Sequence, residues 1–582
     1  MRLPKSCIAL GFALASAPAW SQVDPLAPVE EPPVSTETPV ANPAAPPLPP
    51  PVRVVPRNWG EVFAAIRAGD WTGAELGIAA LPSSVIAPVA KAELYTAKGS
   101  PEVALEAILA LLAEAPDLPQ AEQLSRLAAA RGALTPPAIV QARPTIGLPM
   151  APRRGRARPV SGEPLADALR LALDPLVKAD DAAGAEALLV TQGPYLSFEA
   201  RAEAAQRVAF IHYVMNRDAD ARRISDQWRP GATGEWGAQA AWISGLAAWR
   251  MGDCNASRAA FGDALRFGSG AEFRAAAAYW SARSAQACGR PREVQPLLLA
   301  AAQSPESFYG LLARETLGMS TTMAAPRTTA PSPRVAQSAN VRRASELAGI
   351  GERALAEAML RHQAKIGSPA DQRDLITVAR SLDLGGAQFW LAHNGQPGVR
   401  IHPADRYPTP RWVPDRGWRV DPALAFAHVI QESNFRADAV SPAGAVGLMQ
   451  VRPGTAGDTA RARGESISLA ALKRPQTNLE HGQSFIELIR SSSATDGQLP
   501  RVIAAYNAGP VPVQRWRYVN DRGDPLLWIE SLPYWETRYY VPAVMRNMWV
   551  YQGMAGAEQP TLRALAEHRW PSFPVTATRL AR

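Results

Sequence analysis

The stretch WISGLAAWRMG at residues 242–252 decides the fold class, because its pattern returns as YWSARSAQACG at residues 279–289. Aromatic, Ser, Ala and Gly positions recur 37 residues apart in the two stretches. Helix-turn-helix units with a period in the mid-thirties are typical of α-solenoids, in which small residues let neighbouring helices approach closely. We therefore expect an all-α protein with an α-superhelical solenoid. An irregular Ala-rich helical bundle is the alternative.

Short turn signals elsewhere in the chain favour the same architecture. Gly69-Asp70 and Gly252-Asp253 each precede an Ala-containing helical segment, whereas the alternation typical of strands is scarce. The solenoid is predicted to span residues 58–318, with a Pro- and Arg-rich break at about residues 135–163. A Thr-, Ser- and Pro-rich break at about residues 319–338 ends it.

The first residues have the pattern of a secretory signal peptide over residues 1–21. Two basic residues precede an apolar run, and small residues before Gln22 offer a cleavage site. This run is too short to span a bilayer, and no later stretch reaches about 18 apolar residues. We therefore expect a soluble protein exported to the periplasm, without stable membrane insertion. The many prolines of residues 22–57 predict a disordered leader.

Cysteine content and charge narrow the function classes only partly. Loss of the signal peptide leaves Cys254 and Cys288, which either form one disulfide in an oxidising compartment or stay as free thiols. No metal site is expected, since the chain has neither C-x-x-C nor H-E-x-x-H. The formal charge of +8 suits an anionic polymer, either cell-wall glycan with its acidic peptides or nucleic acid. Apart from a cluster at residues 153–158 the basic residues are dispersed, so charge alone does not decide between these two polymers.

A predicted helix near residue 430 carries the candidate catalytic residue. Asp421 is placed as its N-cap and Pro422 as its first helical residue, and Glu432 lies near its end. Apolar residues at helical spacing bury this helix, and a carboxyl group against an apolar wall stays protonated near neutral pH. His428 lies one turn earlier on the same face, where it either tunes Glu432 or simply packs.

Three sequence blocks carry a resemblance to a known family. The first runs from Glu432 through a Gly-rich turn to Gln450, the second is AYNAGP at residues 505–510, and the third is ETRYYV at residues 536–541. In this order, over about 110 residues, they closely resemble the soluble lytic transglycosylases, relatives of goose-type lysozyme. The stretch FYGLLA at residues 308–313 is similar to the end of the superhelical domain in the large members.

The resemblance implies a three-part plan, in which a solenoid is followed by a small helical linker domain and a lysozyme-like α catalytic domain. On this chain the linker domain would span residues 339–400 and the catalytic domain residues 401–560. Two positions depart from the family pattern: Ala437 stands where proline is common, and Ile430 where a basic residue is common. Neither residue takes part in the expected reaction, but both affect the shape of the cleft.

The resemblance also implies cleavage of the β-1,4 bond between N-acetylmuramic acid and N-acetylglucosamine of peptidoglycan, with Glu432 as the acid and then the base. A second carboxylate falls in no matching position, since Asp421 lies three helical turns earlier and Asp438 lies in the turn beyond. The family's solution is substrate assistance: the N-acetyl group supports the cationic centre. Ionised Glu432 then takes a proton from the sugar's 6-hydroxyl, which closes a 1,6-anhydro ring.

Further family positions imply substrate contacts around the Gly-rich turn. Gly447 would permit a tight backbone path beside the sugar. Ser441 and Gln450 would hydrogen-bond the acetamido groups, and Met449 would line the floor of the subsite.

The second and third blocks add the remaining candidate residues. Tyr506 would reach the reaction centre, with Asn507 as an anchor of the turn. Glu536 would contact polar groups of the substrate, and Tyr540, one turn later, would complete that subsite.

The implied partners are peptidoglycan glycan strands and other cell-wall enzymes, with no nucleic acid and no cofactor. Two alternatives are a lysozyme-like hydrolase, in which water attacks in place of the 6-hydroxyl, and a non-catalytic scaffold that binds the cell wall.

Overall fold

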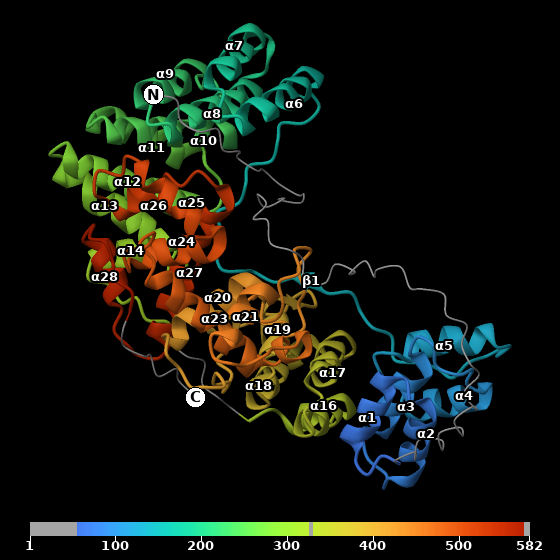
Figure 1. Ribbon diagram of the computed structural model, residues 1–582. Helices are drawn as coiled ribbons and strands as arrows, with labels where there is room; N and C mark the ends of the chain where they lie inside the picture. The colour runs from blue at the N-terminus through green and yellow to red at the C-terminus, as the bar shows by residue number, and fades with distance from the viewer. Residues whose placement is uncertain (1–54, 325–329, 575–582) are drawn as a thin grey trace, which may run out of the picture. The chain divides into compact units, whose positions relative to one another are not determined.

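The computed structural model describes residues 55–324 and 330–574. The predicted signal peptide and all but the last three residues of the predicted leader therefore lie outside the described residues. The described chain forms two compact units, of which one ends at residue 139 and the other begins at residue 140. Figure 1 shows that both units are built of helices, which confirms the predicted all-α class. Among the described residues, no helix has both the length and the apolar character needed to cross a membrane.

The first unit consists of five short helices in sequence. Asn58 and Asp70 cap the first two helices by accepting hydrogen bonds from Glu61 and Gly73 backbone N–H groups, as is usual at helix N-termini. The helices are α1 (Trp59–Ala68), α2 (Trp71–Ala80), α3 (Ala87–Thr96), α4 (Leu105–Glu114) and α5 (Ala121–Ala130).

The second unit begins with the part of the predicted solenoid that follows the Pro- and Arg-rich break. Each helix packs mainly on its neighbours in sequence, so the chain advances as helical hairpins (Figure 1). The helices are α6 (Pro164–Lys178), α7 (Ala182–Gln192), α8 (Phe198–Val214), α9 (Asp218–Trp228), α10 (Glu235–Arg250), α11 (Cys254–Phe267), α12 (Ala271–Ala287), α13 (Pro291–Ala302) and α14 (Phe308–Thr316), with the 3-10 helix η1 (Gly193–Tyr195).

The 37-residue repeat occupies equivalent places in α10 and α12. Trp242 and Tyr279 are both buried in the core. Gly252 and Gly289 follow the two helices with φ of 77° and 67°, a backbone conformation that glycine adopts at little cost. Asp253 then caps α11. The repeat is therefore a packing repeat, as the sequence predicted.

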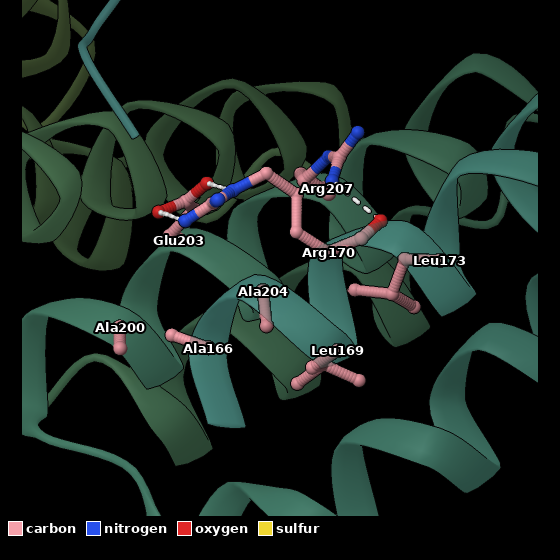
Figure 2. Close-up of a pocket in the computed structure, with 8 residues that line it drawn as sticks. All are labelled: Ala166, Leu169, Arg170, Leu173, Ala200, Glu203, Ala204 and Arg207. Atoms are coloured by element: carbon pink, nitrogen blue, oxygen red, sulfur yellow. Dashed lines mark hydrogen bonds and ion pairs between the residues drawn. The ribbon is translucent and has the colours of Figure 1, made fainter. Parts of the chain in front are cut away.

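Alanines let the first solenoid helices approach closely. Figure 2 shows Leu169 and Leu173 of α6 facing the alanines of α8, where only about 10 Å³ of cavity remains. Above this contact Arg170 donates to Glu203 at 2.8 Å. Glu203 also accepts the backbone N–H of Val160 at 2.8 Å, so it ties the segment before α6 to the solenoid.

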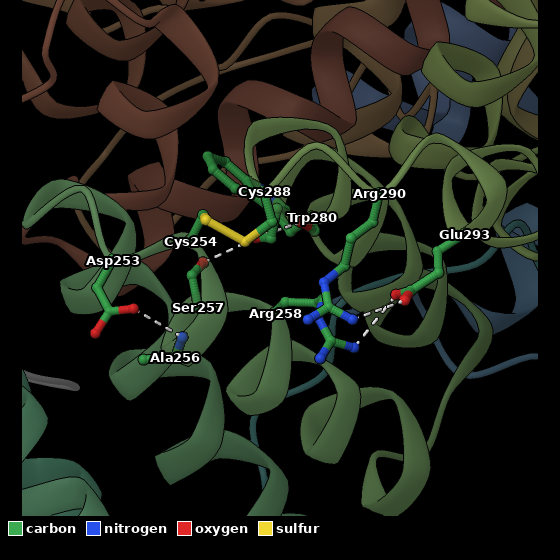
Figure 3. The surroundings of a disulfide bond; sticks show 10 residues. Asp253, Cys254, Ala256, Ser257, Arg258, Trp280, Cys288, Arg290 and Glu293 are labelled. Atoms are coloured by element: carbon green, nitrogen blue, oxygen red, sulfur yellow. Dashed lines mark hydrogen bonds and ion pairs between the residues drawn. A yellow bond between two sulfur atoms is a disulfide. The ribbon is translucent and has the colours of Figure 1, made fainter.

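Cys254 and Cys288 form a disulfide between the start of α11 and the end of α12 (Figure 3). The sequence left this pairing open. Beside the bridge, the buried hydroxyls of Ser257 and Ser284 lie 2.9 Å apart, so the two helices are also joined by a hydrogen bond.

Replacing both cysteines should loosen the solenoid measurably. The bridge spans 34 residues of chain, and closing a loop of that length removes about 3–4 kcal/mol of conformational freedom from the unfolded chain. We expect Cys254→Ser/Cys288→Ser to unfold at lower urea concentration than the wild type, by far-UV circular dichroism. Reductant should shift the wild type to the same midpoint and leave the variant unchanged. If reductant does not shift the urea midpoint of the wild type, the disulfide does not stabilise the protein.

The predicted Pro- and Arg-rich break contains an extended segment, residues 143–160, which we call the strap. Its β1 (Ile146–Gly147) pairs antiparallel with β2 (Asn394–Gly395), far along the chain. Near its other end the carbonyl of Arg158 accepts from the indole N–H of Trp236 at 2.8 Å. The strap is thus fastened at both ends within the second unit. No sequence pattern indicates these contacts, because every partner lies far away in the chain.

Two further groups of helices follow the solenoid. The first comprises α15 (Pro333–Ala336), α16 (Ala339–Gly349), α17 (Arg353–Ile366), η2 (Pro369–Asp371), α18 (Gln372–Ser381) and α19 (Gly385–His393). The second comprises η3 (Pro403–Arg406), α20 (Pro422–Ser433), α21 (Pro453–Arg461), α22 (Leu469–Leu472), α23 (Pro475–Arg490), α24 (Leu499–Ala508), α25 (Pro510–Arg515), η4 (Trp516–Tyr518), α26 (Pro525–Glu530), α27 (Trp535–Met554) and α28 (Pro560–Ala566). The domain limits given from the sequence stay predictions.

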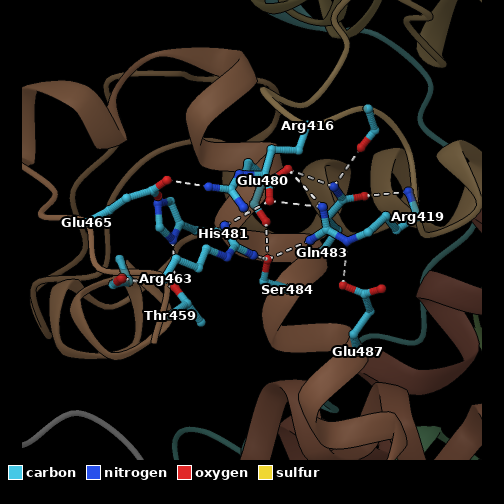
Figure 4. A network of polar contacts seen from close by, with 12 residues as sticks. Arg416, Arg419, Thr459, Arg463, Glu465, Glu480, His481, Gln483, Ser484 and Glu487 are labelled. Atoms are coloured by element: carbon cyan, nitrogen blue, oxygen red, sulfur yellow. Dashed lines mark hydrogen bonds and ion pairs between the residues drawn. The ribbon is translucent and has the colours of Figure 1, made fainter. Parts of the chain in front are cut away.

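A polar network fixes the chain just before α20 (Figure 4). Arg419 donates to Glu480 at 3.0 Å and to Glu487 at 2.8 Å, both on α23. The side chain of Gln483 accepts the backbone N–H of Arg419 at 3.0 Å. Glu480 is buried, so this network holds the residues directly before α20 against α23.

Candidate active site

Helix α20 presents Glu432 from its last turn. Asp421 caps the helix by accepting the backbone N–H of Ala423 at 2.9 Å, which confirms the predicted start. The helix packs on α27, and all of its residues before Gln431 are buried. Asn434 then takes a left-handed conformation with φ of 53°, so the helix stops directly after the carboxylate.

The carboxyl group of Glu432 has the acidity of a general acid. Burial raises its pKa from 4.5 to about 7. The Tyr540 hydroxyl donates to its Oε1, which lowers this pKa, and the negative charge of Glu536 raises it. Near neutral pH both protonation states are therefore populated, as a group that first gives and then takes a proton requires.

Behind Tyr540 lies His428, which is fully buried. Burial lowers its pKa to about 3, so the imidazole is neutral at physiological pH. Its Nδ1 lies 2.8 Å from the Tyr540 oxygen. Since the Tyr540 hydrogen goes to Glu432, the network assigns the Nδ1 hydrogen of His428 to Tyr540. Of the two alternatives left open by the sequence, packing is confirmed, and His428 also reaches Glu432 through Tyr540.

Tyr506, which lies on α24, packs on His428. Its ring centroid lies 4.4 Å from that of His428, and its hydroxyl donates to the carbonyl of Met449 at 2.7 Å. Burial and the charge of Glu432 raise the Tyr506 pKa well above its usual value. The structure thus brings Tyr506 and Tyr540, from two of the three sequence blocks, to Glu432 from the first.

The Gly-rich turn is held by a residue that the sequence did not suggest. Asn478 of α23 is fully buried and accepts the backbone N–H of Met449 at 2.8 Å. Its amide donates to the carbonyls of Val446 and Leu472, each at 2.8 Å. Gly447 has φ of 80°, and a Cβ there would lie 2.2 Å from Nδ2 of Asn478. Glycine is therefore required at this position by both backbone and space.

Three other predicted residues of this turn contact the protein itself. The hydroxyl of Ser441 accepts the backbone N–H of Ala445 at 3.0 Å. The amide of Gln450 donates to the carbonyl of Gly447 at 2.9 Å. The Met449 side chain has 0% exposed area and packs where a Cβ on Gly482 would lie. Its predicted place on a subsite floor stays a prediction, since the described side chain presents no surface.

Asn507 and Glu536 form a pair at the edge of this group. The Asn507 amide donates to Oε1 of Glu536 at 3.2 Å, and the Thr537 hydroxyl donates to the Asn507 oxygen at 2.6 Å. Asn507 therefore holds Glu536, which is more than the turn anchor predicted from the sequence.

Glu536 is also the carboxyl group that acts on Glu432, an influence that the sequence did not reveal. Asp421 lies at the opposite end of α20, about 16 Å away along a helix that rises about 1.5 Å per residue. Asp438 is exposed in the turn beyond the helix. No group of three or more His, Cys, Asp or Glu in the described parts of the chain could hold a metal ion.

Comparisons with known proteins identify similar sequences. The family model described as the Transglycosylase SLT domain matches residues 414–528, which include Glu432 and Tyr506. The soluble lytic murein transglycosylase of Escherichia coli K12 is 35% identical over 156 residues, which are 26% of this chain and 23% of that protein. The chain thus matches about a quarter of the length of that relative. The endo-type membrane-bound lytic murein transglycosylase A of Klebsiella pneumoniae is 31% identical over 162 residues, 24% of this chain and 79% of that protein.

A solved structure extends the likeness to most of the fold. The 70-kDa soluble lytic transglycosylase of Escherichia coli matches with a TM-score of 0.56 and 18% identity. The match covers 88% of this chain and 98% of that chain. It supports the predicted combination of a superhelical part with a lysozyme-like part.

Proposed function

The chain belongs to the lytic transglycosylase family that carries the SLT domain, and from this premise we propose that it is a peptidoglycan lytic transglycosylase. The observation that carries the proposal is Glu432, a carboxyl group at the end of a buried helix with a pKa of about 7 and a hydrogen bond from Tyr540. One group of this acidity can serve as acid and then as base.

In the proposed reaction Glu432 protonates the oxygen that links N-acetylmuramic acid to N-acetylglucosamine. The bond to C1 breaks, and the N-acetyl oxygen of the muramic acid supports the cationic centre. The C6 hydroxyl oxygen then bonds to C1 while its proton goes to the Glu432 carboxylate. The products are a free N-acetylglucosamine 4-hydroxyl and a 1,6-anhydro-muramic acid, and no water is consumed.

Neighbouring residues are assigned supporting roles in this proposal. Tyr540 stabilises the ionised form of Glu432 between the two proton transfers, and His428 positions Tyr540. Tyr506 orients the N-acetyl group, and Glu536, held by Asn507, contacts the sugar's polar groups.

The Gly-rich turn forms the other side of the proposed subsite. Ser441 and Gln450 face the acetamido groups, Gly447 gives the backbone its close path, and Met449 fixes the turn from beneath. We further propose that the reaction takes place in the periplasm, on the glycan strands of the wall. The signal-peptide pattern of residues 1–21 supports this.

The products distinguish this reaction from hydrolysis. Digestion of purified peptidoglycan should release anhydro-muropeptides, which mass spectrometry finds one water lighter than hydrolysed muropeptides. Reducing-end products alone would overturn the proposal and favour a lysozyme-like hydrolase with Glu536 as its second carboxylate. Release of no muropeptide at all would favour the wall-binding scaffold.

Tyr540→Phe should shift the pH profile of kcat/KM to higher pH. The lost hydrogen bond lowers the pKa of Glu432 in the wild type, so its removal should raise that pKa above about 7. A hydrogen bond to a charged group contributes about 1.5–3 kcal/mol, which corresponds to about one to two pH units. The alkaline fall in kcat/KM, where Glu432 loses its proton, should shift by that amount to higher pH. Tyr534→Phe, at the start of the same helix, should not shift it. If the alkaline fall in kcat/KM of Tyr540→Phe stays where it is in the wild type, or moves to lower pH, then the role assigned to the Tyr540 hydrogen bond is contradicted.

A further inference from the structure

Glu432, Tyr540 and His428 form a chain of hydrogen bonds between two helices. Glu432 and His428 both lie on α20, one turn apart, and Tyr540 of α27 bonds both side chains. The Tyr540 oxygen contacts Oε1 of Glu432 and lies 2.8 Å from Nδ1 of His428. His428 has 0% exposed area and Tyr540 has 8%, so this part of the chain is shielded from water.

The chain holds few hydrogens, so each bond constrains the next. Burial lowers the pKa of His428 to about 3, so the ring is neutral and carries one hydrogen, on Nδ1 or on Nε2. With the hydrogen on Nδ1, His428 donates to Tyr540 and Tyr540 donates to Oε1 of Glu432. With the hydrogen on Nε2, Nδ1 takes the Tyr540 hydrogen, and Tyr540 is left to accept one from Glu432.

The tautomer of His428 therefore decides which oxygen of Glu432 carries the catalytic proton. In the first arrangement Oε1 already accepts the Tyr540 hydrogen, so the proton of the neutral carboxyl group lies on Oε2. Within the part of the chain that the structure describes, no residue donates to Oε2, which leaves this oxygen for the substrate. In the second arrangement the proton lies on Oε1, between Glu432 and Tyr540, where the substrate cannot take it.

Two observations favour the first arrangement. The Tyr540 hydroxyl donates to Oε1 in the structure. Nε2 of His428 is buried without a hydrogen-bond partner among the described residues. A partner on the second ring nitrogen commonly fixes the tautomer of a histidine, whereas here Tyr540 alone fixes it. A hydrogen on Nε2 would also leave a buried N–H group without an acceptor, which is unfavourable.

The other titratable groups around the chain do not compete for these hydrogens. Tyr506 of α24 covers the His428 ring, but its hydroxyl donates to the carbonyl of Met449 at 2.7 Å. Glu536 of α27 acts on Glu432 through its charge. The titratable side chains of α23, which also packs on α20, contact other residues: Glu480 and Glu487 pair with Arg419, His481 contacts the Thr459 hydroxyl, and Arg490 lies over the Phe573 ring.

We propose that His428 is a positioning residue of the acid, whose Nδ1 hydrogen keeps Tyr540 donating to Oε1 and so keeps the catalytic proton of Glu432 on Oε2. The inference rests on the proposed function, because it concerns the proton that Glu432 exchanges with the sugar. One arrangement serves both steps, since Oε2 first gives this proton and later takes one. The hydrogen bond that Tyr540 accepts also makes it a stronger donor to the ionised carboxylate.

The tautomer can be measured directly in the wild type. Nitrogen NMR of protein labelled with ¹⁵N-histidine distinguishes a ring nitrogen that carries a hydrogen from one that does not. The signals missing from His428→Asn identify His428. We expect Nδ1 of His428 to carry the hydrogen at about pH 6 and at about pH 8, on either side of the Glu432 pKa of about 7. A hydrogen on Nε2 at either pH would overturn the inference.

Two substitutions separate positioning from packing. His428→Asn keeps an N–H donor near the place of Nδ1, whereas His428→Leu fills the space with an apolar side chain. We expect His428→Leu to lower kcat about ten-fold with little change in KM, as for the loss of one hydrogen bond. The alkaline fall in its kcat/KM should shift to higher pH by a few tenths of a unit, because Tyr540 becomes a weaker donor. His428→Asn should restore most of the rate and the wild-type pH profile.

A double substitution completes the test. In a Tyr540→Phe background, His428→Leu should change neither kcat nor the pH profile further, since the chain is already broken. Equal effects of His428→Asn and His428→Leu, a wild-type pH profile in His428→Leu, or an additive loss in the double variant would each overturn the inference. Thermal unfolding checks that the variants fold, and the tautomer of the wild type decides if they do not.

Failure of this inference differs from failure of the proposed function. If the wild type forms no anhydro products, the proposed function fails. If it forms them while His428 carries its hydrogen on Nε2, only the positioning role fails.

Discussion

Glu432→Gln is expected to lower the rate of anhydro-muropeptide release by about 10³–10⁴-fold. A general acid or base contributes about 10²–10⁴-fold, and here one carboxyl group does both tasks. The amide keeps the shape of the side chain and still accepts the Tyr540 hydrogen, but it cannot exchange a proton. Product release by mass spectrometry measures the loss. Asp438→Asn, an exposed carboxylate in the following turn, should stay near wild-type activity. A variant that still releases these products at a tenth of the wild-type rate would show that Glu432 is not the acid.

The same substitution should make the protein more stable at neutral and alkaline pH. Burial raises the Glu432 pKa from 4.5 to about 7, so its ionisation opposes folding. Below pH 4.5 the carboxyl group is protonated in both the folded and the unfolded state, and the cost is absent. It grows between pH 4.5 and about 7 and is then constant, at about 3 kcal/mol. Thermal unfolding should therefore show Glu432→Gln melting higher than the wild type at pH 8 and level with it near pH 4.

Gly447→Ala is expected to cost about 3 kcal/mol or more of unfolding free energy and to remove most of the activity. The new Cβ would lie 2.2 Å from Nδ2 of Asn478 and 2.7 Å from the carbonyl oxygen of Leu472, at a φ of 80°. Asn478 would have to move, and the turn would lose the hydrogen bond from the Met449 backbone N–H to the Asn478 side chain. Tyr506, which donates to the Met449 carbonyl, would move with it.

Gly444→Ala is the matched control for this substitution. Gly444 has nearly the same φ, 77°, but a Cβ there meets nothing within 4 Å. Gly444→Ala should therefore lower the unfolding free energy only by the backbone strain, about 1–2 kcal/mol. Thermal unfolding of the two variants measures the difference. Equal losses would show that backbone conformation alone, and not Asn478, makes glycine necessary at position 447.

Local patterns of the sequence were sufficient to predict much of the fold. The repeat at residues 242–252, the turn at Gly252 and the cap at Asp421 all depend on neighbours within a few residues, and all three were predicted correctly. The position of Glu432 at a helix end follows in the same way. Such features depend on helix period and capping, which short stretches of sequence contain.

The parts of the site that the sequence did not predict depend on contacts across the fold. Asn478 is an ordinary residue in a helix until its side chain meets three backbone groups of another segment. The influence of Glu536 on Glu432 depends on how α27 packs on α20. The strap could be predicted only as a break, because the partners of Arg154 lie in the solenoid and in the last helices of the chain.

The ion pair between the strap and α26 also sets an order in time. Arg154 precedes Glu530 by 376 residues. At about 5–20 residues per second, a ribosome takes roughly 20–75 seconds to travel from one to the other. Throughout that interval Glu530, the carboxylate that pairs with this guanidinium, is absent. The strap can therefore reach its paired position only once α26 is present, although it stands near the start of this unit.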